Sequence, residues 1–173
     1  MTLRPGNHHA VKIATIPGTM QSNTHNPTPH ISDRSKLVLA ALALQGADAA
    51  LTPVQVQKLF FLLDREIPAL IKGPHFQFSP YDYGPFDPGV YREIENLEAH
   101  SLALTAPSGS RRIYSLTPAG INAGLAFAKD LPQEATDYIK SAGAFVRRLS
   151  FNRLVSSIYK EYPEMRANSI FRE

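Results

Sequence analysis

The sequence predicts a mainly α-helical protein with one small β-hairpin, an α+β fold. The same helix-start motif, a capping residue followed by proline, occurs three times, at Thr52, Asp87 and Thr117. Apolar residues recur at helical spacing after the first two of these starts. Between residues 102 and 116 the sequence instead alternates as strands do, around a turn that contains glycine. These observations predict helices joined by short connections, with one hairpin among them.

Length and composition indicate one globular domain. The chain has 173 residues, of which 43% are hydrophobic and 19% charged, enough to bury a sizeable core. Because it has no cysteine, disulfides and thiolate chemistry are excluded. No apolar run approaches the roughly 20 residues of a membrane helix, and residues 1–19 lack the apolar core of a secretory signal. We therefore expect a cytoplasmic protein with no membrane partner.

The first 34 residues differ from the rest of the chain. They are rich in Thr, Asn, His and Pro and show no periodicity, so we expect a disordered arm over 1–34. Four of the six histidines lie there, where no element fixes ligand geometry, and we expect neither a metal site nor a cofactor. The single helical domain then spans 35–173, with a winged-helix-like core (about 35–120) and C-terminal helices (about 118–162).

The first two helices form the start of this domain. A short apolar helix is expected to begin near Ser35 and to end at Gly46. The next helix begins after Thr52, with Pro53 at its first position and Gln55 completing a capping box. The apolar face of this second helix consists of Val56, Leu59, Phe60 and Leu63.

A helix, a hairpin and a further helix start follow. Asp87 caps a helix over 88–100, and Phe86 can pack on Tyr91 as a hydrophobic staple. Strands are expected at 102–105 and 112–116, joined by a Pro-Ser-Gly-Ser turn. This is the winged-helix order of elements. The apolar stripe of the helix consists of Val90, Ile94 and Leu97.

Three helices complete the domain, at about 118–129, 133–149 and 151–162. In the second, the sequence predicts a buried stripe of Tyr138, Ala142, Phe145 and Leu149. In the third, it predicts a stripe of Phe151, Leu154, Val155, Ile158, Tyr159 and Tyr162. The remaining tail is too short and irregular to assign.

Catalytic motifs are missing from the sequence. It contains no Gly-rich phosphate loop, no H-E-x-x-H and no G-x-S-x-G arrangement. His75 and His100 lie far apart, and neither has a metal-ligand or triad partner near it in the sequence. We therefore expect no catalytic residues and a protein that is not an enzyme.

DNA is one candidate partner. The net charge is +3 and the isoelectric point about 9.2, but residues 35–131 carry eight basic and nine acidic groups. In a winged-helix protein, helix 88–100 would enter the major groove and the hairpin tip would meet the backbone. Three glutamates on that helix, interpreted as a solvated face, repel phosphate: Glu93, Glu95 and Glu98. The candidate DNA-binding residues are Arg92, Asn96, Ser108, Ser110, Arg111 and Arg112.

A protein partner is the other candidate. Helix capping explains residues 86–91 but not the two tyrosines just before them, and paired tyrosines on a fixed loop are typical of interface hot spots. Gly84 before Pro85 suits a tight extended turn. Alternatively, both rings close the core and Asp82 bonds loop amides. The candidate partner-binding residues are Tyr81, Asp82, Tyr83, Gly84, Pro85, Phe86 and Tyr91.

Two segments, VQKLFFLL and PYDYGPFDPGVYREIENLE, resemble the SocA-like, or Panacea, antitoxin-associated domain. The matching elements are Gln57-Lys58-Leu59-Phe60, Tyr83-Gly84-Pro85 and Val90-Tyr91. In addition, IENLEAHSLALTAPSGSRRIYSLTPAG is similar to the closing half of PadR-like winged-helix regulators. The first resemblance implies a small bacterial or phage-borne antitoxin that binds a cognate toxin without being an enzyme. The second keeps a DNA-binding regulator, with operator DNA as its partner, as the alternative.

Overall fold

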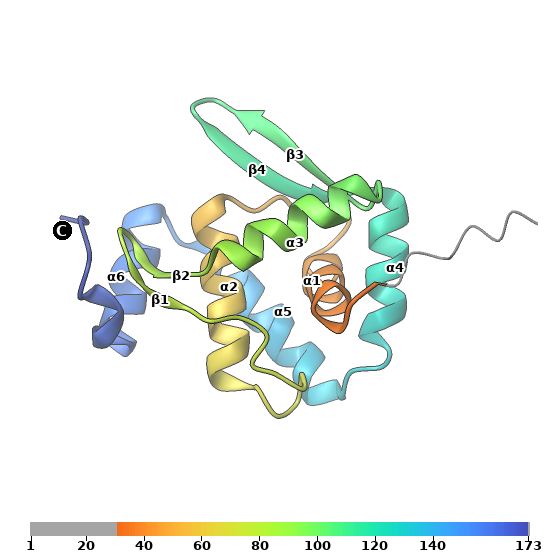
Figure 1. The fold of residues 1–173 in the computed structure, drawn as a ribbon, viewed down its shortest axis with the longest axis horizontal. Coiled ribbons are helices and arrows are strands. Elements are labelled where there is room, and N and C mark those ends of the chain that lie inside the picture. The colour runs from red at the N-terminus through yellow and green to blue at the C-terminus, as the bar shows by residue number, and fades with distance from the viewer. Residues whose placement is uncertain (1–30, 173) are drawn as a thin grey trace, which may run out of the picture. The chain divides into compact units, whose positions relative to one another are not determined.

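The computed structural model describes residues 31–172. Within this range the chain forms six α-helices and two separate two-stranded antiparallel sheets, which confirms the predicted mainly helical α+β class (Figure 1). The helices are α1 (Asp33–Ala43), α2 (Pro53–Glu66), α3 (Pro88–Ala99), α4 (Pro118–Ala128), α5 (Gln133–Arg148), α6 (Phe151–Glu161) and the 3-10 turn η1 (Pro163–Arg166). The strands are β1 (Ser79–Tyr81), β2 (Gly84–Phe86), β3 (Ala103–Ser108) and β4 (Arg111–Leu116).

Helix α2 is the central element of the core. It packs against α5, α3, β2 and β4, so residues 56–64 are buried without interruption. The predicted apolar face of α2 is therefore confirmed, but neighbours cover the other faces as well. As a result, three polar side chains of α2 lie inside the protein: Gln57, Lys58 and Asp64.

The three helix starts that share one motif are present as predicted. The capping hydrogen bonds run from Thr52 N–H to Gln55 Oε1 (2.9 Å), from Gly89 N–H to Asp87 Oδ1 (2.6 Å) and from Gly120 N–H to Thr117 Oγ1 (3.0 Å). The predicted staple is also confirmed, since the rings of Phe86 and Tyr91 lie 5.8 Å apart between centroids. These contacts fix the direction in which the chain enters each helix.

Helix α1 begins earlier than the sequence suggested. Ser32 is its N-cap, so residues 33 and 34 are helical and the predicted arm ends too late. The remainder of that arm, with its four histidines, lies outside the described residues. Helix α1 packs closely on α4, since a Cβ atom at Gly124 would lie 2.3 Å from the carbonyl oxygen of Leu39.

Strands β3 and β4 form the hairpin that we call the wing (residues 103–116). Its strands are longer than predicted, because the pairing continues to Ser108 opposite Arg111 and leaves only two residues in the turn. Leu51 adds a bridge on the other edge of β4, exchanging two backbone hydrogen bonds with Tyr114 at 2.8 and 2.9 Å. The wing is thus anchored to the chain that leads into α2.

The two C-terminal helices differ in how well their faces were predicted. On α6 the stripe is confirmed, with Leu154, Val155, Ile158 and Tyr159 buried between half-buried Phe151 and Tyr162. On α5 the predicted stripe is wrong by about one position. The fully buried line is Ala135, Ile139, Ala142 and Val146, while the larger Tyr138, Phe145 and Leu149 lie half-buried at its sides. The buried line thus alternates two alanines with the larger Ile139 and Val146.

An additional hairpin, absent from our prediction, precedes α3. Strands β1 and β2 pair across a two-residue turn, with Pro80 opposite Pro85, and we call residues 79–86 the tyrosine hairpin. Both strands are edge strands, so prolines can be accommodated without interrupting a continuous ladder. Gly84 has φ +98°, a left-handed conformation that favours glycine. The C-terminal tail fixes the turn, because the Ile170 N–H donates to the Asp82 carbonyl oxygen at 3.0 Å.

Candidate functional site: a pocket beside the tyrosine hairpin

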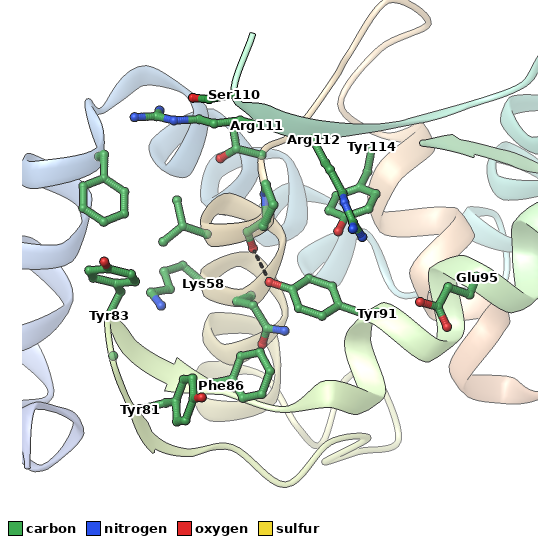
Figure 2. A pocket seen from close by; sticks show the side chains of 16 residues that line it. Lys58, Tyr81, Tyr83, Phe86, Tyr91, Glu95, Ser110, Arg111, Arg112 and Tyr114 are labelled. Carbon is green, nitrogen blue, oxygen red and sulfur yellow. Dashed lines mark hydrogen bonds between the residues drawn. The ribbon is translucent and has the colours of Figure 1, made fainter. Parts of the chain in front are cut away.

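A pocket of about 650 Å³ brings together five of the seven candidate partner-binding residues and three of the six candidate DNA-binding residues (Figure 2). It lies between the tyrosine hairpin, α2, the start of α3, the wing and the start of α6. Its lining consists of Thr52, Pro53, Val54, Gln57, Lys58, Tyr81, Tyr83, Gly84, Phe86, Tyr91, Glu95, Ser110, Arg111, Arg112, Tyr114 and Phe151. Members of the two groups, which the sequence predicts to bind different partners, therefore share one site.

The tyrosine hairpin forms the aromatic wall of the pocket. Tyr81 is 51% exposed and stacks on Phe86, with 4.9 Å between ring centroids. Tyr83 is 41% exposed and meets the ring of Phe151 edge-on at 5.0 Å. The alternative that both tyrosines close the core is therefore wrong. Beneath them Gly84 and Pro85 are buried. Neither Pro85 nor Asp82 lines the pocket, and the Asp82 carbonyl oxygen accepts the hydrogen bond from Ile170 of the tail.

Lys58 contributes a buried amine to the pocket from α2. The residue is only 3% exposed, and its Nζ donates one hydrogen bond to the Pro85 carbonyl oxygen at 3.3 Å. Among residues 31–172, no carboxylate oxygen lies within 4.0 Å of this nitrogen. Burial lowers the pKa of Lys58 to about 7. The amine thus lies beside the pocket with two of its donors unused when it is protonated.

The neighbouring residue, Gln57, is buried as deeply, but both polar atoms of its side chain form hydrogen bonds. Its Nε2 donates to the Asp87 carbonyl oxygen and its Oε1 accepts from the Asp87 N–H, both at 3.0 Å. These two hydrogen bonds hold the start of α3 against α2, so Gln57 has a structural role. In the sequence both residues stand out only within the resemblance. The local signal for Lys58 was its position directly before the apolar run of residues 59–63.

The wing supplies the basic rim. Arg111 and Arg112 are exposed at the start of β4, and Arg112 points toward Tyr91 in Figure 2. Burial, and then the nearby Tyr114, raise the pKa of Tyr91 to about 12, so its hydroxyl stays protonated. Tyr91 and Tyr114 lie 5.9 Å apart between ring centroids, on the side of the pocket where Arg112 lies. Cations over aromatic surface can hold a group that is both anionic and apolar.

Several predicted residues lie apart from the pocket. Arg92 and Asn96 are exposed on α3, and Ser108 is exposed on the wing, but none of them lines the cavity. The interpretation of Glu93 as part of a solvated face is wrong. Its Oε2 accepts from the Ser35 hydroxyl at 2.6 Å and Arg34 lies 3.9 Å away, because this side of α3 faces α1.

A second buried charge, Asp64, lies further along α2. Its Oδ1 accepts from the His75 N–H at 2.9 Å and its Oδ2 from the Phe76 N–H at 2.8 Å. Burial raises the pKa of Asp64, and these two hydrogen bonds act in the opposite direction. Within residues 31–172, no cluster of three or more metal-ligating side chains is present.

Comparison with known proteins adds no relative. No protein-family model matches the chain, and neither a curated protein nor a solved structure does. Among the described helices, none combines the length and apolar character needed to cross a bilayer.

Proposed function

We propose that the protein is a cytoplasmic, non-enzymatic protein-binding module, an antitoxin that holds its cognate toxin at the pocket. The observation that carries this proposal is the pair of exposed tyrosines, Tyr81 and Tyr83, on a hairpin whose turn is bonded to the C-terminal tail. Aromatic side chains on fixed backbone bury much area at a small cost in entropy, which is why they dominate interface energetics.

The motifs behind the resemblance to SocA-like antitoxins support the same site. Gln57 and Lys58 come from one motif, Tyr83 and Gly84 from another and Tyr91 from a third, and all five line the pocket. Segments separated along the sequence therefore meet at one surface. A family motif that served only to build the core would not need to converge on a cavity.

DNA binding by a winged-helix regulator has less support. Arg111 and Arg112 line the pocket, and Glu95 shares the lining with them. A phosphate backbone placed there would meet a carboxylate as well as the arginines. A DNA-binding protein should lose affinity for its promoter steeply with salt, and the double variant Arg111→Glu/Arg112→Glu should not bind. An antitoxin should tolerate the double change better in a growth assay.

Growth rescue tests the proposal. The protein encoded next to this one is expressed alone and then together with this chain, and surviving colonies are counted. We expect the neighbour to kill and the chain to restore growth, whereas Tyr83→Ala should fail, because truncating a hot spot costs roughly 2 kcal/mol or about 30-fold in affinity. Leu125→Ala on α4 is the matched control, since Leu125 is 42% exposed and lies outside the pocket.

Two results would contradict the proposal. A harmless neighbour removes the toxin that an antitoxin requires. Full rescue by a folded Tyr83→Ala variant shows that the partner binds elsewhere. Gly84→Val is a weaker test, because the left-handed backbone at Gly84 means that this change also strains the hairpin.

A further inference from the structure

The buried amine of Lys58 is the polar group of the pocket whose interactions within the fold are least complete. A buried charge is normally compensated by an opposite charge or by several hydrogen bonds. Lys58 has one hydrogen bond, to the Pro85 carbonyl oxygen at 3.3 Å, and no carboxylate within 4.0 Å among the residues that the structure describes. Gly84 borders the amine closely, since a Cβ atom there would lie 3.5 Å from Nζ and 3.3 Å from the Tyr159 ring.

The surroundings of the amine define what could approach it. Tyr83, Phe151 and Tyr91 offer ring surface on the pocket side. The charged residues of the lining are Lys58, Arg111, Arg112 and one acid, Glu95, which gives a net charge of +2 when Lys58 is protonated. The volume of about 650 Å³ falls within the range of about 300–1,000 Å³ that is usual for binding pockets. The pocket therefore fits a compact anion attached to an apolar group.

We propose that the pocket receives an acidic segment of the partner protein, in which a carboxylate pairs with Lys58 while an adjacent aromatic or aliphatic side chain packs on Tyr83 and Phe151. This inference rests on the proposed protein-binding function and adds the chemistry of the bound segment. Because folding has already removed water from the amine, the incoming carboxylate pairs with a cation that needs no further dehydration. The arginines of the wing would then attract acidic residues that flank the segment.

A carboxylate fits the site better than a nucleic acid does. Single-stranded nucleic acid needs a continuous basic groove that follows its backbone, with bases stacked on aromatic rings. Here Glu95 interrupts the basic rim, and Glu98 follows it on α3. The buried position of the Lys58 amine also suits a small terminal group more than a phosphodiester within a chain. An acidic protein segment meets these conditions.

Binding of two small probes to the purified full chain tests the inference without a known partner. The probes are 3-phenylpropionate and 3-phenylpropionamide, which share the same ring and length and differ in charge. We expect the acid to bind at least about tenfold more tightly than the amide at pH 6, with NMR shifts confined to the pocket. In Lys58→Met this difference should disappear while weak binding of the ring remains. Lys140→Met, which removes an exposed lysine of α5, is the matched control and should keep the difference.

Three outcomes would overturn the inference. Equal affinity of the acid and the amide for the wild-type chain shows that the amine is inaccessible and rejects the pairing without any variant. Retention of the acid preference in folded Lys58→Met rejects Lys58 as its source. Tight, salt-sensitive binding of oligothymidylate that displaces the acid assigns the pocket to nucleic acid. Growth rescue is scored separately, so an antitoxin that rescues growth but shows no acid preference would keep its function and lose only this inference.

Discussion

Helix α2 buries two opposite charges in different surroundings, Asp64 beside the loop that follows the helix and Lys58 beside the pocket. Asp64 accepts hydrogen bonds from two backbone N–H groups, so both of its oxygens have partners from residues close behind it in the chain. Lys58 donates to one carbonyl oxygen and otherwise faces the cavity. The two residues lie on the same helix, six positions apart.

This difference separates a charge that builds the fold from one that is available to a ligand. A buried group whose hydrogen bonds are complete stabilises the structure around it, and removing it leaves its partners unsatisfied. A buried group whose hydrogen bonds are incomplete costs stability, and such costs are concentrated at functional sites. The contrast predicts opposite effects on stability for substitutions on one helix.

The largest expected effect is the loss of stability in Asp64→Ala. This change leaves the amides of His75 and Phe76 without their acceptors, and two hydrogen bonds to a charged group are worth about 3–5 kcal/mol. Urea unfolding measures the difference. Asp48→Ala, at an exposed loop position, is the control and should change the unfolding free energy by less than about 0.5 kcal/mol. Equal effects of the two changes would refute the structural role of Asp64.

The next effect is expected in Gln57→Leu, which should destabilise the protein by about 2–3 kcal/mol. The leucine would leave the N–H and carbonyl oxygen of Asp87 without the side chain that satisfies both. The start of α3 should loosen, which amide hydrogen exchange at residues 87–91 would detect. If exchange there is unchanged, Gln57 does not anchor α3.

The smallest and opposite effect is expected in Lys58→Met, which should stabilise the protein by about 1–3 kcal/mol at pH 7. Burial lowers the pKa of Lys58 from 10.5 to about 7, so holding the charge inside costs roughly 4 kcal/mol there, and the unsatisfied Pro85 carbonyl offsets part of the gain. Between pH 7 and 10.5 the unfolded chain binds more protons, so the wild-type protein gains stability as the pH rises. The advantage of the variant should therefore be smaller at pH 9 than at pH 6. A variant less stable than wild type at pH 6 would contradict the account.

Local signals in the sequence were sufficient for most of the helical fold. A capping side chain and a proline in the first turn act within four residues, so Thr52, Asp87 and Thr117 could be identified without any tertiary information. The tyrosine hairpin was missed because Pro80 and Pro85 argue against strands, and only the pairing across a two-strand edge makes them acceptable. The face of α5 was displaced because the prediction followed the largest apolar side chains, whereas the buried line includes the small Ala135 and Ala142.

The candidate site was only partly predictable. Tyr81 and Tyr83 stood out because no capping role explained them, and the structure places both at the pocket. Lys58 did not stand out, since a lysine in a helix normally reaches solvent, and its burial depends on neighbours from β2 and α6. Tertiary packing also brings the wing arginines to the same pocket as the tyrosine hairpin. The sequence does not show this proximity, so the arginines and the tyrosines were predicted to bind different partners.

The most direct test of the central claim is the pKa of the Lys58 amine, measured by NMR titration of the full chain with labelled lysines. Lys58→Met identifies the resonance by its loss. The account predicts a pKa of about 7 in the free protein and a higher value when 3-phenylpropionate is bound, because a carboxylate stabilises the charged amine. A value near the ordinary 10.5 that does not respond to the acid would show a hydrated lysine and would remove the contrast with Asp64.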